Sequence, residues 1–127
     1  RFYALDAETG EEQWVFETNE RITSSPAVSG GTFYVGSEDN HLYAIDASTG
    51  EEQWSFETGD SVGTTSPAVS GGTVYIGSTD NHLYAIDAAT GEEQWSFQTN
   101  NVLVSSPAVS EGTVYIGSLD GSLYAIK

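Results

Sequence analysis

The sequence predicts an all-β fold built from repeated four-stranded units, and three observations lead to this prediction. A segment of the form Ala-x-Asp-x-x-Thr-Gly-Glu-Glu-Gln-Trp occurs three times, at 4–14, 44–54 and 85–95. Short runs rich in Val, Ile, Tyr and Thr follow one another, and none has a helical period. Glycine-rich and Asp-Asn dipeptides separate these runs at regular intervals. The chain is therefore expected to be a repeat protein.

The repeat is about 40 residues long. Trp14 and Trp54 are 40 residues apart, whereas Trp54 and Trp95 are 41 apart. Pro26 and Pro67 are 41 residues apart, and Pro67 and Pro107 are 40 apart. One extra residue therefore lies between Trp54 and Pro67.

Each period is expected to hold four strands, which in one repeat are 66–70, 73–78, 82–87 and 93–99. Tight turns that tolerate a positive φ should join the first strand to the second and the second to the third. The first type falls at Gly30-Gly31, Gly71-Gly72 and Glu111-Gly112, and the second at Asp39-Asn40, Asp80-Asn81 and Asp120-Gly121. Each unit is thus predicted to be an antiparallel meander.

The third turn of each unit lies inside the repeated segment. Asp46 ends an apolar alternating run, and Thr49-Gly50 precede the run that contains Trp54. Asp suits the first position of a type I turn and Gly the left-handed position that closes it. A hairpin connection of four or five residues is expected here, with Asp6, Asp46 and Asp87 as turn formers.

Apolar residues occupy both faces of the expected strands. Tyr75, for example, alternates with Val74 and Ile76. A sheet that is apolar on both sides must be sandwiched between neighbours. Four short strands per repeat, stacked face to face, are typical of a β-propeller blade.

Counting strands gives thirteen, or about three blades. The expected division is 1–18 (third and fourth strands), 22–58 (a full blade), 64–99 (a full blade) and 104–127 (the first three strands). Propellers close with roughly 4–8 blades, so the ring is expected to be incomplete. Either the chain is a piece of a longer propeller, or several copies associate. Phe2–Asp6 and Leu123–Ile126 are versions of the same strand, so strand exchange between copies is plausible. The shared strand is, however, one too many per chain. This surplus favours a piece of a longer propeller over association of several copies.

The repeated segment, preceded by Leu-Tyr and followed by Ser-Ser-Pro-Ala-Val, resembles the tryptophan-docking motif of PQQ-like (pyrroloquinoline quinone type) propeller repeats. That family contains quinone-dependent enzymes and non-enzymatic relatives in outer-membrane protein assembly or at the cell surface. The resemblance implies that each Trp lies in an outermost strand and docks on the next blade. It also implies that the Ser-Ser-Pro-Ala-Val strands line the central channel. These strands lie at 24–28, 65–69 and 105–109, with Thr65 in the first serine position. It also implies an extracytoplasmic or cell-surface location. The implied docking residues are Ala4, Asp6, Gly10, Trp14, Ala44, Asp46, Gly50, Trp54, Ala85, Asp87, Gly91 and Trp95.

The charge balance is strongly acidic. Nineteen Asp and Glu residues face three Lys and Arg, which gives a net charge of −16. Nucleic acid and anionic membrane surfaces are therefore not expected partners, and no apolar stretch reaches the ~18 residues of a membrane span. A surface that carries mostly negative charges is favoured in molar salt, because the salt screens the repulsion between the carboxylates. We therefore expect a haloarchaeal origin. A cation-binding acidic face is the alternative.

The residues that would carry chemistry are sparse. The absence of cysteine excludes disulfides, thiolate metal sites and a cysteine nucleophile. Relatives that use PQQ typically combine Trp stacking, an adjacent-cysteine disulfide and a calcium held by Glu, Asn and Asp. No such set breaks the repeat here, so neither PQQ nor calcium, nor any catalytic or metal residue, is predicted. His41 and His82 are expected to be exposed strand histidines.

The sequence therefore predicts a non-catalytic scaffold whose partners are further blades, from copies of itself or from a longer propeller, and a protein on one rim. Differences between repeats concentrate in the loops 19–23, 59–64 and 100–104, as a binding rim would require, although unconstrained drift looks the same. Two alternatives remain. One is a piece of a PQQ-dependent quinoprotein dehydrogenase; the other is an engineered or consensus repeat, because 42–58 and 83–99 differ at only two positions, Ser48/Ala89 and Glu57/Gln98.

Overall fold

The computed structural model describes all 127 residues and confirms the all-β fold. Thirteen strands form four antiparallel sheets, and none of the elements is a helix that could cross a membrane. The strands are β1 (Phe2–Leu5), β2 (Glu12–Phe16), β3 (Ala27–Ser29), β4 (Thr32–Gly36), β5 (His41–Asp46), β6 (Glu52–Glu57), β7 (Ala68–Ser70), β8 (Thr73–Gly77), β9 (His82–Asp87), β10 (Glu93–Gln98), β11 (Ala108–Ser110), β12 (Thr113–Gly117) and β13 (Leu123–Ile126).

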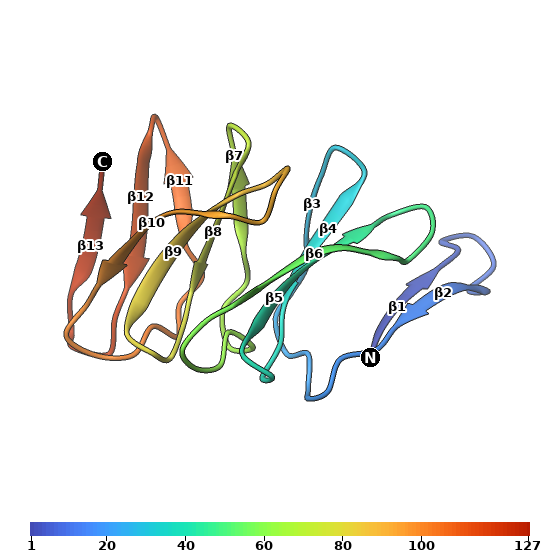
Figure 1. Cartoon of the computed structure of the whole chain (residues 1–127), viewed down its shortest axis with the longest axis horizontal. Helices are drawn as coiled ribbons and strands as arrows, with labels where there is room; N and C mark the ends of the chain where they lie inside the picture. The colour runs from blue at the N-terminus through green and yellow to red at the C-terminus, as the bar shows by residue number, and fades with distance from the viewer.

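The four sheets are consecutive pieces of the chain. They are the hairpin β1-β2, the full meanders β3-β4-β5-β6 and β7-β8-β9-β10, and the three-stranded sheet β11-β12-β13. Figure 1 shows them side by side in chain order, from the N-terminal hairpin to the C-terminal sheet, as an open row of blades. The first strands of neighbouring blades contact each other, β3 with β7 and β7 with β11, as strands around a common axis would.

The first strands are shorter than the sequence pattern suggests. The strand expected to begin at Ser66 begins at Ala68, because Pro67 has no N–H to offer the sheet. The N–H of Ser66 is also unavailable to the sheet, since it donates to Ser106 Oγ of the next blade at 2.9 Å. Only three residues remain to pair with β8.

The predicted turn conformations are confirmed. Asn40 and Asn81, in the turns between second and third strands, have φ values of 73° and 74°. Both glycines of the Gly-Gly turns also have positive φ. In the third such turn, Glu111 takes φ 49° where the other two blades have glycine, so a side chain is held in a backbone conformation that disfavours it.

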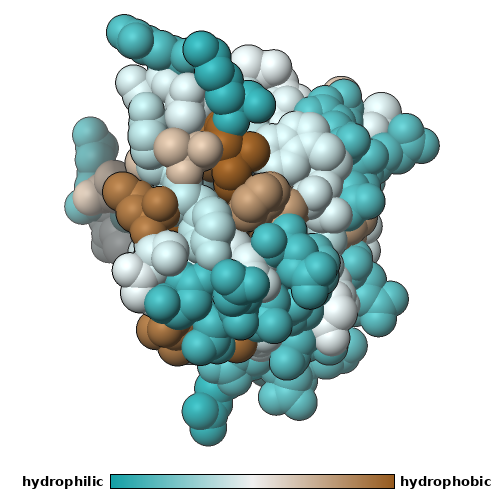
Figure 2. Space-filling model, turned by 90° about the vertical axis from the view of Figure 1, so that its left-hand side faces the viewer, coloured by the Kyte–Doolittle hydropathy of each residue, from teal (hydrophilic) through white to brown (hydrophobic).

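The core lies between the sheets. Leu42 and Ala44 from the second blade are fully buried against Val74, Ile76 and Ile86 from the third. A second cluster, which includes Leu83 and Ile116, joins the third blade to the fourth. At the two ends the corresponding faces are open. Figure 2 shows hydrophobic side chains in the middle of the face formed by β11–β13, between hydrophilic margins, and Leu123 there is 74% exposed.

Candidate interaction sites

The turn between the third and fourth strands of each blade is fixed by its aspartate. Asp46 Oδ1 accepts the N–H groups of Ser48 at 2.8 Å and Thr49 at 3.0 Å, and the Gly50 N–H donates to the Asp46 carbonyl at 2.9 Å. The Ser48 hydroxyl hydrogen bond, followed by the two backbone ones, lowers the pKa of Asp46 below the usual Asp value. Asp6 and Asp87 make the same two backbone contacts. The aspartate thus holds the turn and leaves Gly50 at φ 77°.

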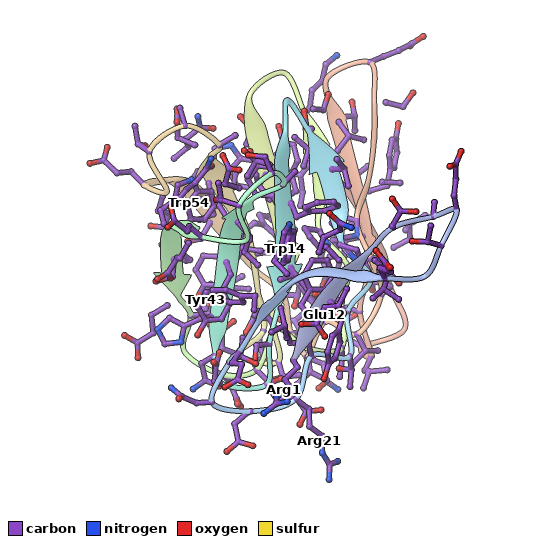
Figure 3. The ribbon with its side chains drawn as sticks, turned by 90° about the vertical axis from the view of Figure 1, so that its right-hand side faces the viewer. Arg1, Glu12, Trp14, Arg21, Tyr43 and Trp54 are labelled. Carbon is purple, nitrogen blue, oxygen red and sulfur yellow. The ribbon has the colours of Figure 1, made fainter.

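The indole of each preceding blade lies on this turn. A Cβ atom at Gly50 would come within 2.6 Å of the Trp14 ring, and Trp14 Nε1 donates to the Ala47 carbonyl at 3.0 Å. Figure 3 shows Trp14 between the N-terminal hairpin and the blade behind it. Trp54 repeats the arrangement on Gly91, where a Cβ would lie at 2.7 Å, and its Nε1 donates to the Ala88 carbonyl at 2.9 Å. We call the segments 6–10, 46–50 and 87–91 the tryptophan seats.

The motif alanine has a different place from the motif glycine. Ala44 is the cross-strand partner of Trp54 in the same sheet, and it is fully buried. Ala4 and Ala85 pair with Trp14 and Trp95 in the same way. A small side chain here leaves room for the adjacent indole on that face. The alanine therefore lies beside the Trp of its own blade, whereas the glycine lies under the Trp of the preceding one.

The three copies of the motif are not equivalent. Trp14 and Trp54 alone among the three tryptophans donate a hydrogen bond to a seat. Trp95 packs on Tyr75, with ring centroids 5.9 Å apart, but has no seat within the chain. Conversely, nothing lies within 4 Å of a Cβ placed on Gly10, although its φ of 75° matches that of Gly50 and Gly91. One end thus carries an indole without a seat and the other a seat without an indole.

A second link between blades runs along the innermost strands. The Ser25 N–H donates to Ser66 Oγ and the Ser66 N–H donates to Ser106 Oγ, both at 2.9 Å. Ser66 therefore accepts a hydrogen bond from the blade before it and donates one to the blade after it. Ser25 Oγ and the Ser106 N–H are the ends of this series.

The variable rim loops are anchored by one buried apolar residue each, which the sequence reasoning missed. Val62 and Leu103 are fully buried, and their N–H groups donate to the carbonyls of Ser37 and Ser78 at 3.3 Å. Ile22 is the half-buried counterpart in the first loop. A signal was present, since each of these residues follows its blade's Trp by eight positions.

These anchors also locate the extra residue of the second period. Thr65 and Ser105 are equivalent, because their hydroxyls donate to the Gly77 and Gly117 carbonyls at 2.6 and 3.0 Å. Between the anchor and this hydroxyl lie residues 63–64 in one loop and only Val104 in the other. The insertion is therefore confined to Gly63-Thr64.

The Asp-Asn turns form a further link at the rim. Tyr43 donates its hydroxyl proton to Asp39 Oδ2 at 2.7 Å, and the same oxygen accepts the N–H of Asn19 from the preceding loop at 3.3 Å. Burial, and then the hydrogen bond to Asp39, raises the pKa of Tyr43. Tyr84 bonds Asp80 likewise, and Asp80 Oδ2 accepts the Gly59 N–H at 2.8 Å. The two carboxylates are thus already bonded to protein donors.

His41 and His82 belong to these same turns. They are half-buried rather than exposed, and each ring Nδ1 lies within hydrogen-bonding distance of the preceding Asp carbonyl, 2.8 Å for Asp39 and 3.0 Å for Asp80. The His41 ring stacks on Tyr43 with centroids 5.7 Å apart. No three His, Asp or Glu side chains are grouped as metal ligands, and the chain has no pocket.

Stacked antiparallel meanders, in which the outer-strand indoles of Trp14 and Trp54 lie on the following blade, define a propeller-type repeat protein. The family model described as "Outer membrane protein assembly factor BamB" matches residues 1–127. The chain belongs to this family of PQQ-like propeller repeats.

Solved structures give the same fold. BamB from Moraxella catarrhalis is 27% identical with a TM-score of 0.85, and the match covers 98% of this chain and 39% of that one. The quinohemoprotein alcohol dehydrogenase ADHIIG from Pseudomonas putida HK5 is 29% identical with a TM-score of 0.71, over 81% of this chain and 17% of that one. The computationally designed Ika4 protein is 18% identical with a TM-score of 0.83, and the match covers 97% of this chain and 78% of that one. This last likeness shows a shared fold alone. No curated protein matches the sequence.

Proposed function

We propose that this chain is a non-catalytic propeller scaffold that presents a protein-binding rim and works at high salt. The observation that carries the proposal is the construction of the rim loops. Their backbones are fixed by Val62, Leu103 and the Asp–Tyr links, while the outward residues differ from blade to blade. A rigid frame with variable tips is how binding residues are usually displayed.

The exposed tips have a distinct chemistry. Glu20 and Arg21 project from the first loop, Asp60 from the second and Asn101 from the third; Figure 3 shows Arg21 pointing away from the blades. These tips carry two carboxylates against one guanidinium, on a chain whose net charge is −16. A basic protein surface is the partner that complements them.

The rim can be tested by charge reversal. Glu20→Lys together with Asp60→Lys should abolish capture of a partner from an extract of the source cells, because both side chains are exposed on the rim. Glu52→Lys, at an exposed position of β6 on the outer edge, is the matched control and should leave capture unchanged. Equal loss in all variants, or no loss in the rim variant, would contradict a rim-borne site.

The competing function is a piece of a quinoprotein dehydrogenase, which the 29% identity to an alcohol dehydrogenase favours. Calorimetric titration with PQQ and calcium separates the two. The scaffold proposal expects no saturable heat for either ligand. Saturable binding at micromolar PQQ would overturn it.

The salt requirement is a separate part of the proposal. Nineteen acidic residues against three basic ones repel each other strongly at low ionic strength, and the Debye length falls to roughly 3 Å at 1 M salt. Circular dichroism should therefore show a folded β protein in molar KCl and a lower melting temperature in dilute buffer. The same melting temperature in both would contradict adaptation to salt.

We also propose that the repeated motif has a docking role. In this proposal the seats at 46–50 and 87–91 hold Trp14 and Trp54, and the blade units are 1–18, 22–58, 64–99 and 104–127. The contacts of Gly50 and Gly91 support it. The substitutions Trp54→Ala and Gly91→Ala test it.

A further inference from the structure

The rim carries three matched sets of side chains, one at each junction between a rim loop and the Ser-x-Asp turn of the following blade. Each set holds the residue before the buried anchor, the residue before the Ser or Thr that opens the next Ser-Pro segment, and the residue after the turn serine. We call these sets the rim trios. The first is Arg21, Thr23 and Glu38, the second is Ser61, Thr64 and Thr79, and the third is Val102, Val104 and Leu119.

The members of a rim trio lie side by side. In all three trios the N–H of the turn residue donates to the carbonyl of the residue before the anchor, at 2.9, 3.0 and 3.1 Å in chain order. In the first trio, a Cβ atom placed on Gly63 would come within 2.8 Å of Glu38 Cγ and 3.1 Å of Thr23 Oγ1, so both side chains border the same point. The repeated backbone contacts give the other two trios the same arrangement.

The trio positions reach the surface even where the chain has a blade on either side. The second trio lies in the middle of the row, between the first and third rim loops. There Thr64 is exposed, and Ser61 and Thr79 are half-buried. The third trio uses the same positions, so blades on both sides would leave it accessible as well.

The three trios differ in chemistry. The first carries opposite charges on Arg21 and Glu38, the second carries three hydroxyls and the third carries three aliphatic side chains. Elsewhere in the rim loops and the Ser-x-Asp turns, the only aliphatic residues are the anchors Ile22, Val62 and Leu103. The third trio is therefore the aliphatic patch of the rim.

High salt determines which of these groups can supply affinity. The Debye length falls to roughly 3 Å at 1 M salt, so charges on an exposed rim attract a partner only in direct contact. Burial of apolar surface is not screened in this way. In the high salt of the proposed function, a partner must therefore gain its affinity mainly from the third trio. The carboxylates of Glu20 and Asp60 select its charge and orientation at close range.

We propose that the rim binds a protein segment that combines aliphatic with basic side chains, and that its aliphatic side chains pack on the third trio. The exposed carboxylates of Glu20 and Asp60 belong to the first and second rim loops, so the basic side chains lie toward that side. The segment then binds in one direction along the row of blades. This inference rests on the proposed rim function and names the chemistry of its partner.

The test uses a library of random peptides displayed on phage and selected against the folded chain in molar KCl. The selected peptides should be enriched in aliphatic residues together with Lys or Arg. Fluorescence anisotropy then gives the dissociation constant of the most frequent peptide. Selection of peptides that lack aliphatic residues, selection of acidic peptides, or no selection at all would overturn the proposal.

The second trio supplies matched substitutions for the third. Val102→Ser, Val104→Thr and Leu119→Thr together install the side chains that the second junction already carries on an equivalent backbone, and circular dichroism verifies the fold. This triple variant should bind the selected peptide roughly tenfold more weakly or worse in molar KCl, as is typical for loss of a central apolar contact. Val28→Thr, at an exposed position of β3 rather than in a rim loop, is the control and should bind normally. Unchanged binding by the triple variant, or an equal loss in the control, would contradict docking on the third trio.

This result is distinguishable from failure of the rim function itself. The variant with Glu20→Lys and Asp60→Lys tests the rim independently, through capture of the partner from source cells. If that variant loses capture while the triple variant keeps its affinity for the peptide, the rim function stands and the third trio is not the docking point. If neither variant loses binding, both proposals fall.

Discussion

The middle junction of the molecule and its two ends are built from the same sequence motif but have different surroundings. At the middle junction, Trp54 covers Gly91 and Ala44 is fully buried. At the ends, Trp95 has no seat and Gly10 has nothing over it. The motif therefore has no fixed energetic value. What it contributes depends on whether the neighbouring blade is present.

The largest difference in stability loss between the middle junction and the ends is expected when Trp54 or Trp95 is removed. Trp54→Ala should destabilise the folded chain by roughly 3–5 kcal/mol, because it removes a packed ring and leaves a cavity between blades. Trp95→Ala should cost much less, since this ring packs on Tyr75 but covers no seat and donates no hydrogen bond to a seat. Urea denaturation in molar KCl, followed by far-UV circular dichroism, measures both. Equal losses would mean that the seat adds nothing to the burial of the ring.

The seat glycines give a cleaner comparison. Gly91→Ala and Gly10→Ala both impose a side chain on a φ near 75°, which costs about 1 kcal/mol in each. Only at Gly91 does the new Cβ also clash with Trp54, at 2.7 Å, which should add roughly 1–3 kcal/mol. Thermal unfolding of the two variants isolates this second cost. If the two melting temperatures fall equally, the indole does not press on the seat.

The rim tyrosines should show a smaller difference. Tyr84→Phe removes a hydrogen bond to the Asp80 carboxylate and should cost about 1–2 kcal/mol. Tyr124→Phe removes the equivalent bond to Asp120, at 2.6 Å, and should cost less because the end blade is covered on one face only. Burial raises the pKa of Tyr84 above the ordinary value near 10, so its contribution is complete below that pH and is lost as the pH rises. An alkaline unfolding curve unchanged by Tyr84→Phe would contradict this.

Glu111→Gly is expected to stabilise the protein by about 0.5–1 kcal/mol. Glu111 has φ 49° at a position where the other two blades use glycine, so the substitution relieves backbone strain in the end blade alone. Glu111→Ala is the control, because it removes the charge but keeps the strain. A gain from alanine equal to that from glycine would assign the effect to charge.

The smallest difference between middle and ends is expected at the turn aspartates. Backbone N–H groups of the same turn lower the pKa of Asp6, Asp46 and Asp87, with the Ser48 hydroxyl adding to the effect at Asp46. A lowered pKa contributes stability that is present above the unfolded value near 3.9 and is lost as the pH falls through the folded one. Carboxyl titration by NMR should find all three below the ordinary range. An ordinary pKa at Asp6 alone would contradict this explanation. Only the Asp6 turn has no indole over it, so the docked indole rather than the turn N–H groups would then lower the pKa of the other two aspartates.

The sequence predicted most of what depends on local pattern. Thirteen strands and the positive-φ turns at Asn40 and Asn81 follow from short-range rules, because alternation and turn chemistry act within a few residues. The tryptophan seats were expected only through the family resemblance. Spacing alone could not show that an indole reaches a turn more than thirty residues away in the chain.

The interpretation failed where one residue serves two blades. Asp39 was read only as a turn former, yet it also accepts from Asn19 of the preceding loop. Val62 stands alone between Ser61 and Gly63, and Leu103 lies in a run of only three apolar residues, so no periodic pattern marks either as core. His41 was expected to be exposed, although its ring stacks on Tyr43. The contacts of Asp39, Val62 and Leu103 arise between loops and blades that are far apart in the chain, which a linear pattern does not encode.

The confinement of the extra residue to Gly63-Thr64 has a consequence for how such proteins can change in length. Val62 and Thr65 keep their contacts on either side, so the blades stay in register across the one inserted residue. We expect gene duplications and small insertions to accumulate at this site, beside the exposed Thr64, without disturbing the stack. It is also the place where a foreign peptide, such as an epitope tag, can be grafted.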